Sequence, residues 1–237
     1  MADPTLLDLV KNGTMNSDTA ATLWTIAQER RSFMVVAVPR FAGKSTVTKA
    51  MLAFVPQGVP MHYLSGDEAE MEQLRQHPDD GYLVVGEFSK APVPTYIWGS
   101  PVRKVFETLR AGFSLTTALH APSVEEAYVA VCQGNEVADE DASRISYMLY
   151  IERMGTDLDN FWRRIARVYE VDRVVGGVPQ ARLLHSWAED GDRFERVEEP
   201  RMLSSSASVL QDRARRIQQA VDAGRTTESD VAALSAG

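Results

Sequence analysis

Gly43, Lys44 and Ser45 stand between a short apolar run, Phe33–Val38, and a stretch with helical spacing, Ser45–Phe54. A strand, a tight turn and a helix in this order bring backbone N–H groups together at a helix N-terminus, where the helix dipole attracts anions. A lysine at this point reaches the β- and γ-phosphates of a nucleotide, and a serine hydroxyl ligates Mg²⁺. The spacing therefore predicts a phosphate-binding loop.

The first half of the motif G-x-x-x-x-G-K-[ST] is altered. Its leading glycine falls at Val38, and Phe41 replaces a second small residue. Loop glycines adopt backbone conformations that are unfavourable for a residue with a Cβ, most of all a β-branched one. The alternative interpretation is that the sequence Gly-Lys-Ser-Thr merely starts a helix. If the loop binds nucleotide, its contacts come from Pro39, Arg40, Phe41, Ala42, Gly43, Lys44, Ser45 and Thr46.

The elements around this loop alternate between strands and helices. Apolar runs predict strands at 33–38, 61–65, 82–85 and 114–119, and helical spacing predicts helices at 45–54, 68–76, 102–110 and 124–133. Residues 91–101, with three prolines, are expected to be irregular. The pattern predicts an α/β fold with a mostly parallel sheet flanked by helices. Later strands at 147–153, 165–171 and 181–186, with turns at 157–160 and 175–179, predict an antiparallel extension of that sheet.

Both ends of the chain are expected to be helical. Two helices are predicted within residues 1–32, which we interpret as an N-terminal helical arm before a core at 33–200. Residues 201–237 form a Ser-rich linker and a helical tail. In that tail, an amphipathic helix at 209–223 is marked by Val209, Arg213, Ile217 and Val221.

Composition excludes several classes of protein. The 237 residues include 25 Lys and Arg and 33 Asp and Glu, a net charge of −8, which argues against a general binder of nucleic acid or anionic membranes. A single cysteine, Cys132, excludes an internal disulfide and a four-cysteine zinc site. No signal pattern is visible, and no apolar run approaches the ~20 residues of a membrane span. We expect a cytoplasmic protein with no nucleic-acid partner and no membrane insertion.

Three further segments follow the phosphate loop in a recognisable order. The first runs from Leu74-Arg75-Gln76-His77-Pro78-Asp79 into Tyr82–Glu87, the second is Ala111–Ala121, and the third joins Leu149–Arg153 to Arg163–Glu170. They resemble, in turn, the Walker B region, the histidine box and the late strands of the type II and type IV secretion traffic ATPases, which include pilus motors. The resemblance covers Leu6 to Trp187, and the combination of boxes is more specific than any one of them.

The resemblance implies a RecA-like ATPase core that binds ATP and Mg²⁺. Such proteins are usually hexamers with nucleotide at subunit boundaries, so the implied partners are further copies of the chain and inner-membrane platform proteins of a pilus or secretion machine. The implied location is the cytoplasm, peripheral to the inner face of the cell membrane through those partners. The family's larger N-terminal domain is expected to be missing, because only 32 residues precede the strand that leads into the phosphate loop.

Residue roles transfer one at a time. Lys44 would neutralise the β- and γ-phosphates, Ser45 would ligate Mg²⁺, and Glu87 would act on the attacking water or on the metal. His120 matches the family histidine, which approaches the γ-phosphate. Asp67 and Glu68 fall where the family carries an acidic box, in reversed order, and are candidates for a water-activating base. The alternative for these two is an acidic first helical turn.

Two functions remain open on these residues. Lys44, Ser45, Glu87 and His120 favour an ATP-hydrolysing motor for pilus assembly, pilus retraction or protein secretion. Val38, Phe41 and a shortened acidic region favour a degenerate nucleotide-binding or structural homologue that acts through protein contacts without hydrolysis. The shortened region also removes the family's usual source of arginines that act across a subunit boundary, for which the candidates are Arg75, Arg103 and Arg110.

Overall fold

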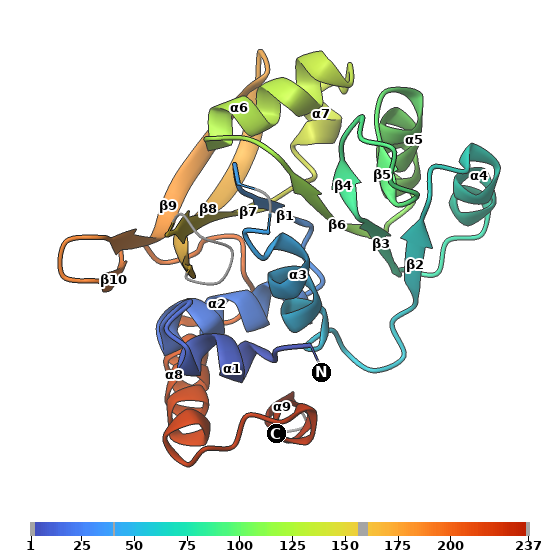
Figure 1. Cartoon of the computed structure of the whole chain (residues 1–237). Coiled ribbons are helices and arrows are strands. Elements are labelled where there is room, and N and C mark those ends of the chain that lie inside the picture. The colour runs from blue at the N-terminus through green and yellow to red at the C-terminus, as the bar shows by residue number, and fades with distance from the viewer. Residues whose placement is uncertain (1–2, 40, 156–160, 236–237) are drawn as a thin grey trace.

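The computed structural model describes residues 3–39, 41–155 and 161–235, and it contains an eight-stranded sheet covered by helices on both faces (Figure 1). Five strands are parallel, in the order β2-β3-β6-β1-β7, and three antiparallel strands follow as β8-β9-β10. The strands are β1 (Phe33–Val36), β2 (Met61–Leu64), β3 (Tyr82–Val85), β6 (Ser114–Leu119), β7 (Tyr147–Met154), β8 (Trp162–Val175), β9 (Val178–Ala188) and β10 (Arg193–Arg196). The predicted α/β arrangement with late antiparallel strands is confirmed at this level.

Strand β1 separates two hydrophobic cores. Because side chains alternate along a strand, Phe33 and Val35 enter one core and Met34 and Val36 enter the other. All four residues are buried, as expected for a strand covered on both faces. The strand thereby fixes the loop that follows it at the centre of the sheet.

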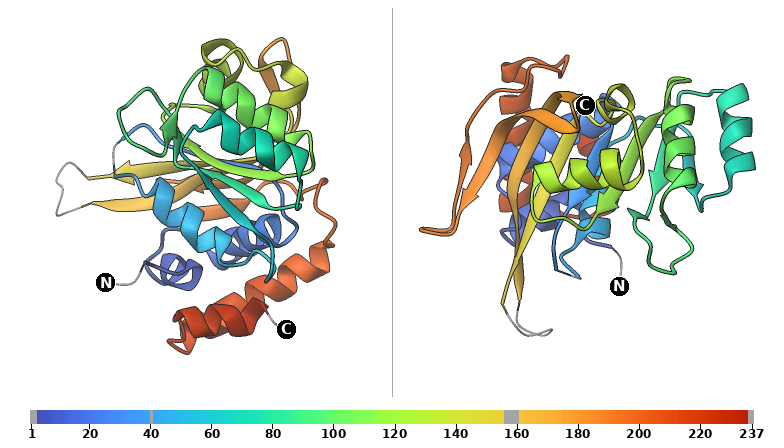
Figure 2. Two further views of the ribbon diagram at one scale, coloured as in Figure 1. Left: turned by 90° about the vertical axis from the view of Figure 1, so that its right-hand side faces the viewer. Right: turned by 90° about the horizontal axis from the view of Figure 1, so that it is seen from above.

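The helices divide between the two faces. One core is covered by α1 (Leu6–Lys11), α2 (Ser17–Gln28), α3 (Lys44–Leu52), α8 (Ala207–Asp222) and α9 (Glu228–Ser235). The other is covered by α4 (Glu68–Gln76), α5 (Ser100–Leu109), α6 (Val124–Val129), the π-helical turn Ala130–Gly134 and α7 (Asp139–Ala142). Both ends of the chain pack on the first face, where α2 and α8 lie side by side (Figures 1 and 2). The division into arm, core and tail stays a prediction.

Several predicted boundaries were wrong. The helix expected at 124–133 is split, because α6 ends at Val129 and passes into the π-helical turn. The irregular stretch 91–101 contains a short strand, β5 (Tyr96–Ile97), that pairs in parallel with β4 (Glu87–Phe88), and α5 begins at Ser100. Strands β8 and β9 are longer than expected and leave only Gly176 and Gly177 in the turn between them. The turn predicted at 157–160 lies outside the described residues.

The buried face of α8 also differs from the prediction. Leu210, Ala214, Ile217 and Ala220 are buried, whereas Val209 is among the exposed apolar residues. The guanidinium of Arg213 lies 4.9 Å from the centre of the Trp24 ring on α2, so this arginine packs against the core instead of extending into solvent. No helix in the described parts of the chain is both long enough and apolar enough to cross a bilayer.

Pairing between β7 and β8 contains a β-bulge. Tyr150 pairs with Arg167, but the next residue, Ile151, pairs with Ile165, so Ala166 is an extra residue on β8. The β7–β8 hairpin projects beyond the ends of the neighbouring strands on the side of the phosphate loop (Figure 2). It therefore brings residues distant in sequence close to that loop.

The buried imidazole of His185 on β9 leads to a pH prediction. Its Nε2 lies 2.8 Å from Thr22 Oγ1, and burial, followed by the charge of Arg196, lowers its pKa to about 3. The unfolded chain therefore binds a proton below about pH 6.5 that the folded chain does not. We expect the free energy of unfolding to fall by about 2 kcal/mol between pH 7 and pH 5. For His185→Gln, urea denaturation should show a free energy of unfolding that changes less with pH over this range. The same pH dependence as in the wild type would contradict the lowered pKa of His185.

Candidate functional site

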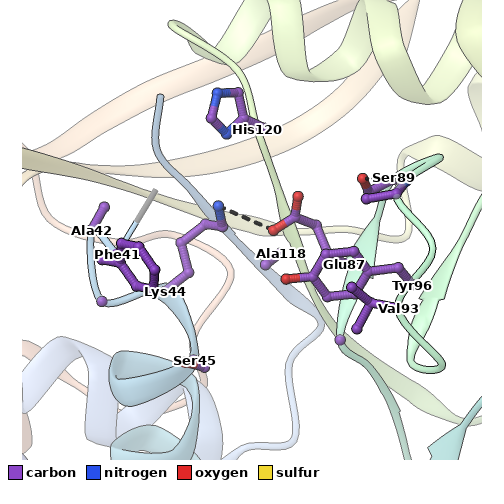
Figure 3. A pocket seen from close by; sticks show the side chains of 13 residues that line it. Phe41, Ala42, Lys44, Ser45, Glu87, Ser89, Val93, Tyr96, Ala118 and His120 are labelled. Carbon is purple, nitrogen blue, oxygen red and sulfur yellow. Dashed lines mark hydrogen bonds and ion pairs between the residues drawn. The ribbon is translucent and has the colours of Figure 1, made fainter. Parts of the chain in front are cut away.

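A cavity of about 700 Å³ opens at the carboxyl ends of three adjacent parallel strands, β1, β6 and β3 (Figure 3). Ligands of open α/β sheets bind at this edge, and the volume lies within the range of small-molecule sites. The cavity is lined by Phe41, Ala42, Gly43, Lys44, Ser45, Gly86, Glu87, Ser89, Ala91, Val93, Tyr96, Ala118 and His120.

Two opposite charges form an ion pair in the cavity. Lys44 is the first residue of α3, and its Nζ lies 3.1 Å from Glu87 Oε2, which follows β3 (Figure 3). Their side chains are only 13% and 10% exposed. Charged groups with so little exposure to water need a partner of opposite charge, and Lys44 and Glu87 are each other's partner. An anion that entered the cavity would offer Lys44 a second partner and would be repelled by Glu87.

Two of the described residues in the loop between β1 and α3 have left-handed backbone conformations. Gly43, which precedes α3, has φ +94°, a conformation that residues with a Cβ rarely adopt. Phe41 has φ +61°, which is unfavourable for a bulky residue. Val38 is not among the described non-glycine residues with positive φ. The expectation that Val38 would carry the backbone penalty was therefore wrong, and Phe41 carries it instead.

An arginine from the β7–β8 hairpin holds this turn. Nε and Nη2 of Arg163 both donate hydrogen bonds to the carbonyl oxygen of Phe41, at 3.1 and 2.9 Å. A Cβ at Gly43 would lie 2.9 Å from Cδ of Arg163, so a side chain there would displace the arginine. Burial, and then the positive charge of Arg153, lower the pKa of the Arg163 guanidinium. Phe41 itself is 70% exposed, so its ring does not fill the cavity.

Glu87 is placed by a close backbone approach. A Cβ on Gly86 would lie 2.8 Å from the carbonyl oxygen of Thr95, and the N–H of Gly86 donates to that same oxygen at 3.0 Å. Glycine thus lets β4 lie against β5, which aims the carboxylate of Glu87 at Lys44. His120 directly follows β6 and lines the same cavity beside this pair (Figure 3).

The predicted residues of the loop, together with Glu87 and His120, separate into three groups. Phe41, Ala42, Gly43, Lys44, Ser45, Glu87 and His120 line one cavity. Pro39 lies in the loop and Thr46 in α3, and neither is among the residues that line the cavity. Arg40, which we expected to contact nucleotide, lies outside the described residues.

Asp67 and Glu68, the candidates for a water-activating base, do not line the cavity. Asp67 caps α4, accepting hydrogen bonds from the N–H groups of Ala69 and Glu70. Glu68 accepts a hydrogen bond from the hydroxyl of Ser100 at 2.5 Å. This arrangement matches the alternative interpretation of an acidic first helical turn.

The three arginines considered for a role across a subunit boundary all have acidic partners within the chain. Arg75 pairs with Glu72, Arg103 with Glu136, and Arg110 with Asp141. Each would have to leave that partner to reach a neighbouring molecule.

One wall of the cavity was missed from the sequence. Ser89, Val93 and Tyr96 line the side that faces the phosphate loop across the Lys44–Glu87 pair (Figure 3), and Ala91, from the same segment, also lines the cavity. The signal was available, because this segment directly follows Glu87 and its prolines limit how far the backbone can move away.

The loop offers a chemically suitable place for a nucleotide and Mg²⁺. Gly43, which precedes α3, has no side chain to cover the backbone N–H groups there, and a Cβ at this position would be too close to Arg163. Lys44 and Ser45 begin the helix. Within the described residues, no cluster of three or more His, Cys, Asp or Glu side chains is placed to hold a metal ion. Mg²⁺ in nucleotide sites takes most of its ligands from phosphates, water and one or two side chains, which Ser45 and Glu87 can supply.

Comparison with known proteins identifies little beyond a distant structural similarity. Neither a protein-family model nor a curated protein matches the chain. Among solved structures, the chain is similar to the ATPase DotB of Legionella pneumophila, with 12% sequence identity and a TM-score of 0.39. The alignment covers 88% of this chain and 61% of DotB, so the chain spans less than two thirds of that protein.

Proposed function

We propose that the chain binds ATP with Mg²⁺ in the cavity at the carboxyl ends of β1, β6 and β3 and hydrolyses it. The observation that carries the proposal is the Lys44–Glu87 pair, 3.1 Å apart, at the start of the helix that follows the central strand. A basic and an acidic side chain here are the groups that phosphoryl transfer requires beside a phosphate loop.

Each side chain has a defined task in this proposal. Lys44 binds the β- and γ-phosphate oxygens, and the backbone N–H groups at the start of α3 bind the phosphates from the same side. The Ser45 hydroxyl ligates Mg²⁺, which neutralises phosphate charge. Glu87, released from Lys44 when phosphate arrives, accepts a hydrogen bond from the attacking water, and His120 lies close to the terminal phosphate.

The wider role in this proposal is that of a secretion- or pilus-type motor with a RecA-like core. It rests on the order of the sequence motifs that lead to Lys44, Glu87 and His120. Assembly into a hexamer, contact with inner-membrane platform proteins and a cytoplasmic location at the inner face of the membrane belong to the same proposal.

A second candidate function is nucleotide binding without hydrolysis. It is favoured by the positions of Asp67 and Glu68, which are engaged in capping α4 and in bonding Ser100 away from the cavity. In this case the nucleotide stabilises one conformation, and the chain acts through contacts with other proteins.

Thermal unfolding with and without Mg-ATP tests the binding step. At a hundredfold excess of Mg-ATP over Kd we expect Tm to rise by about 5–10 °C, since the ligand adds about 2.7 kcal/mol to the folded state. Lys44→Ala should abolish the rise. Lys49→Ala is the matched control, because Lys49 lies on the same helix in an exposed pair with Asp3 and should leave the rise intact. An equal rise in Lys44→Ala would refute this site.

A further inference from the structure

Two arginines face each other directly across the β7–β8 hairpin. Arg153 on β7 pairs with Arg163 on β8, and both guanidinium groups lie over the ring of Phe161, at 4.4 and 4.6 Å from its centre. Like charges at directly opposite positions destabilise a sheet. The stacking on Phe161 compensates in part, since cation–π contacts are favourable. A pair of this kind needs a reason beyond the stability of the hairpin.

Arg163 makes contacts that suggest the reason. Its two donated hydrogen bonds end on the carbonyl oxygen of Phe41, whose backbone is left-handed. Two nitrogens of one planar guanidinium on a single oxygen fix the direction of that carbonyl. Arg163 therefore holds a residue whose backbone conformation is unfavourable.

The loop lacks the means to hold this conformation alone. A left-handed residue with a Cβ is unfavourable by about 1–2 kcal/mol, and a phosphate loop normally avoids the penalty with glycine. The Phe41 side chain is largely exposed and contributes little packing that would offset it. A conformation of this kind persists when its surroundings over-determine it.

We propose that Arg163 is a positioning residue for the phosphate loop: it holds Phe41 in the left-handed conformation that a glycine would adopt there without help. The inference rests on the proposed binding of nucleotide at this loop. Arg163 acts through the backbone of Phe41 and does not itself contact phosphate. Arg153 supports it by sharing the stack on Phe161, which keeps the Arg163 guanidinium directed at the loop.

A glycine rescue tests the proposal. We expect Arg163→Ala to weaken Mg-ATP binding about 5- to 30-fold in calorimetric titration, the range that corresponds to the left-handed penalty. Adding Phe41→Gly should restore the affinity to within about twofold of Phe41→Gly alone, because glycine adopts this backbone without help. The double variant Arg163→Ala with Phe41→Ala is the matched control, since alanine removes the ring but keeps the Cβ. Its affinity for Mg-ATP should stay as low as that of Arg163→Ala.

The results separate a positioning role from a direct charge contact. If Arg163 bound phosphate itself, Arg163→Lys would retain most of the affinity and Phe41→Gly would not rescue Arg163→Ala. Either result overturns the proposal. Arg163→Lys keeps the charge but loses the planar two-nitrogen geometry, so we expect it to bind weakly, and its Tm without nucleotide verifies that the variant is folded.

A measurement without nucleotide separates this inference from the proposed function. In hydrogen exchange of the free protein, we expect the amide of Val47, which donates to the carbonyl oxygen of Gly43 at 3.0 Å, to exchange faster in Arg163→Ala than in the wild type. Faster exchange in a protein that fails to bind Mg-ATP would retain the positioning role and reject the function. Unchanged exchange together with unchanged affinity would reject the positioning role alone.

Discussion

Replacing Glu87 by Gln is expected to stop hydrolysis and to tighten nucleotide binding. Glutamine cannot orient and deprotonate the attacking water as a carboxylate does, so we expect kcat to fall by at least about 100-fold. The same change removes the charge that now pairs with Lys44 at 3.1 Å and that repels a triphosphate. A hydrogen bond to a charged group contributes about 1.5–3 kcal/mol, so losing this competitor should lower Kd for Mg-ATP about tenfold or more.

Phosphate release and calorimetric titration measure the two effects separately. Glu195→Gln provides a control with the same loss of charge. Glu195 forms an exposed pair with Arg193 on β10, and three strands, β9, β8 and β7, separate β10 from the strands at the cavity. Both quantities should be unchanged in that variant. No phosphate release by the wild type at any protein concentration would instead favour the second candidate, binding without hydrolysis, while tighter binding by Glu87→Gln would still locate the nucleotide.

The largest stability effect is expected at Glu170, a fully buried carboxylate on β8. It accepts hydrogen bonds from the hydroxyl of Tyr147 at 2.7 Å and from the N–H groups of Arg201 and Met202 at 2.9 and 2.8 Å, and it pairs with Arg182. Burial alone would raise the pKa of Glu170, but these donors together lower it. One side chain thus joins β7, β8, β9 and the segment that leads to α8.

We expect Glu170→Gln to lower the free energy of unfolding by about 3 kcal/mol, since it leaves Arg182 without its counter-charge and sets an amide N–H₂ against donors. Urea denaturation provides the measurement. Tyr147→Phe removes only one of the bonds and should cost about 1 kcal/mol. A loss below about 1 kcal/mol in Glu170→Gln would mean that the carboxylate does not hold these strands together.

The elements that the sequence predicts best are those whose two ends are marked locally, and helix α4 was both predicted and observed at Glu68–Gln76. Strands β3 and β6 were predicted with the observed boundaries, because Tyr82–Val85 and Ser114–Leu119 are short apolar or β-branched runs between turn residues. Strand β8 was underestimated at both ends. Its outer residues, among them Arg163, Arg164 and Arg173, carry charge, and local hydropathy gives no sign of the pairing with β7 and β9.

The site follows the same division. Lys44 and Ser45 were found because the motif Gly-Lys-Ser stands between a strand and a helix, and Glu87 was found only through the resemblance of the segment around it to a known motif. The contribution of Arg163 was not predictable from spacing, since 122 residues separate it from Phe41 and no local pattern marks the contact. The sequence left two interpretations of Asp67 and Glu68 open, because an acidic helix start and an acidic catalytic box have the same composition.

The extra residue Ala166 on β8 decides toward which face of the sheet Arg163 points. Directly opposite residues on paired strands share a face, so Arg163 lies on the face of Ile151 and Ile165, whereas Arg167 lies on the other. Regular pairing along the whole of β8, with the same amino acids, would invert the alternation beyond Ala166 and turn Arg163 to the far side of the sheet. A homologue could therefore keep every residue of the loop and lose the contact between Arg163 and Phe41 through a change in strand register alone.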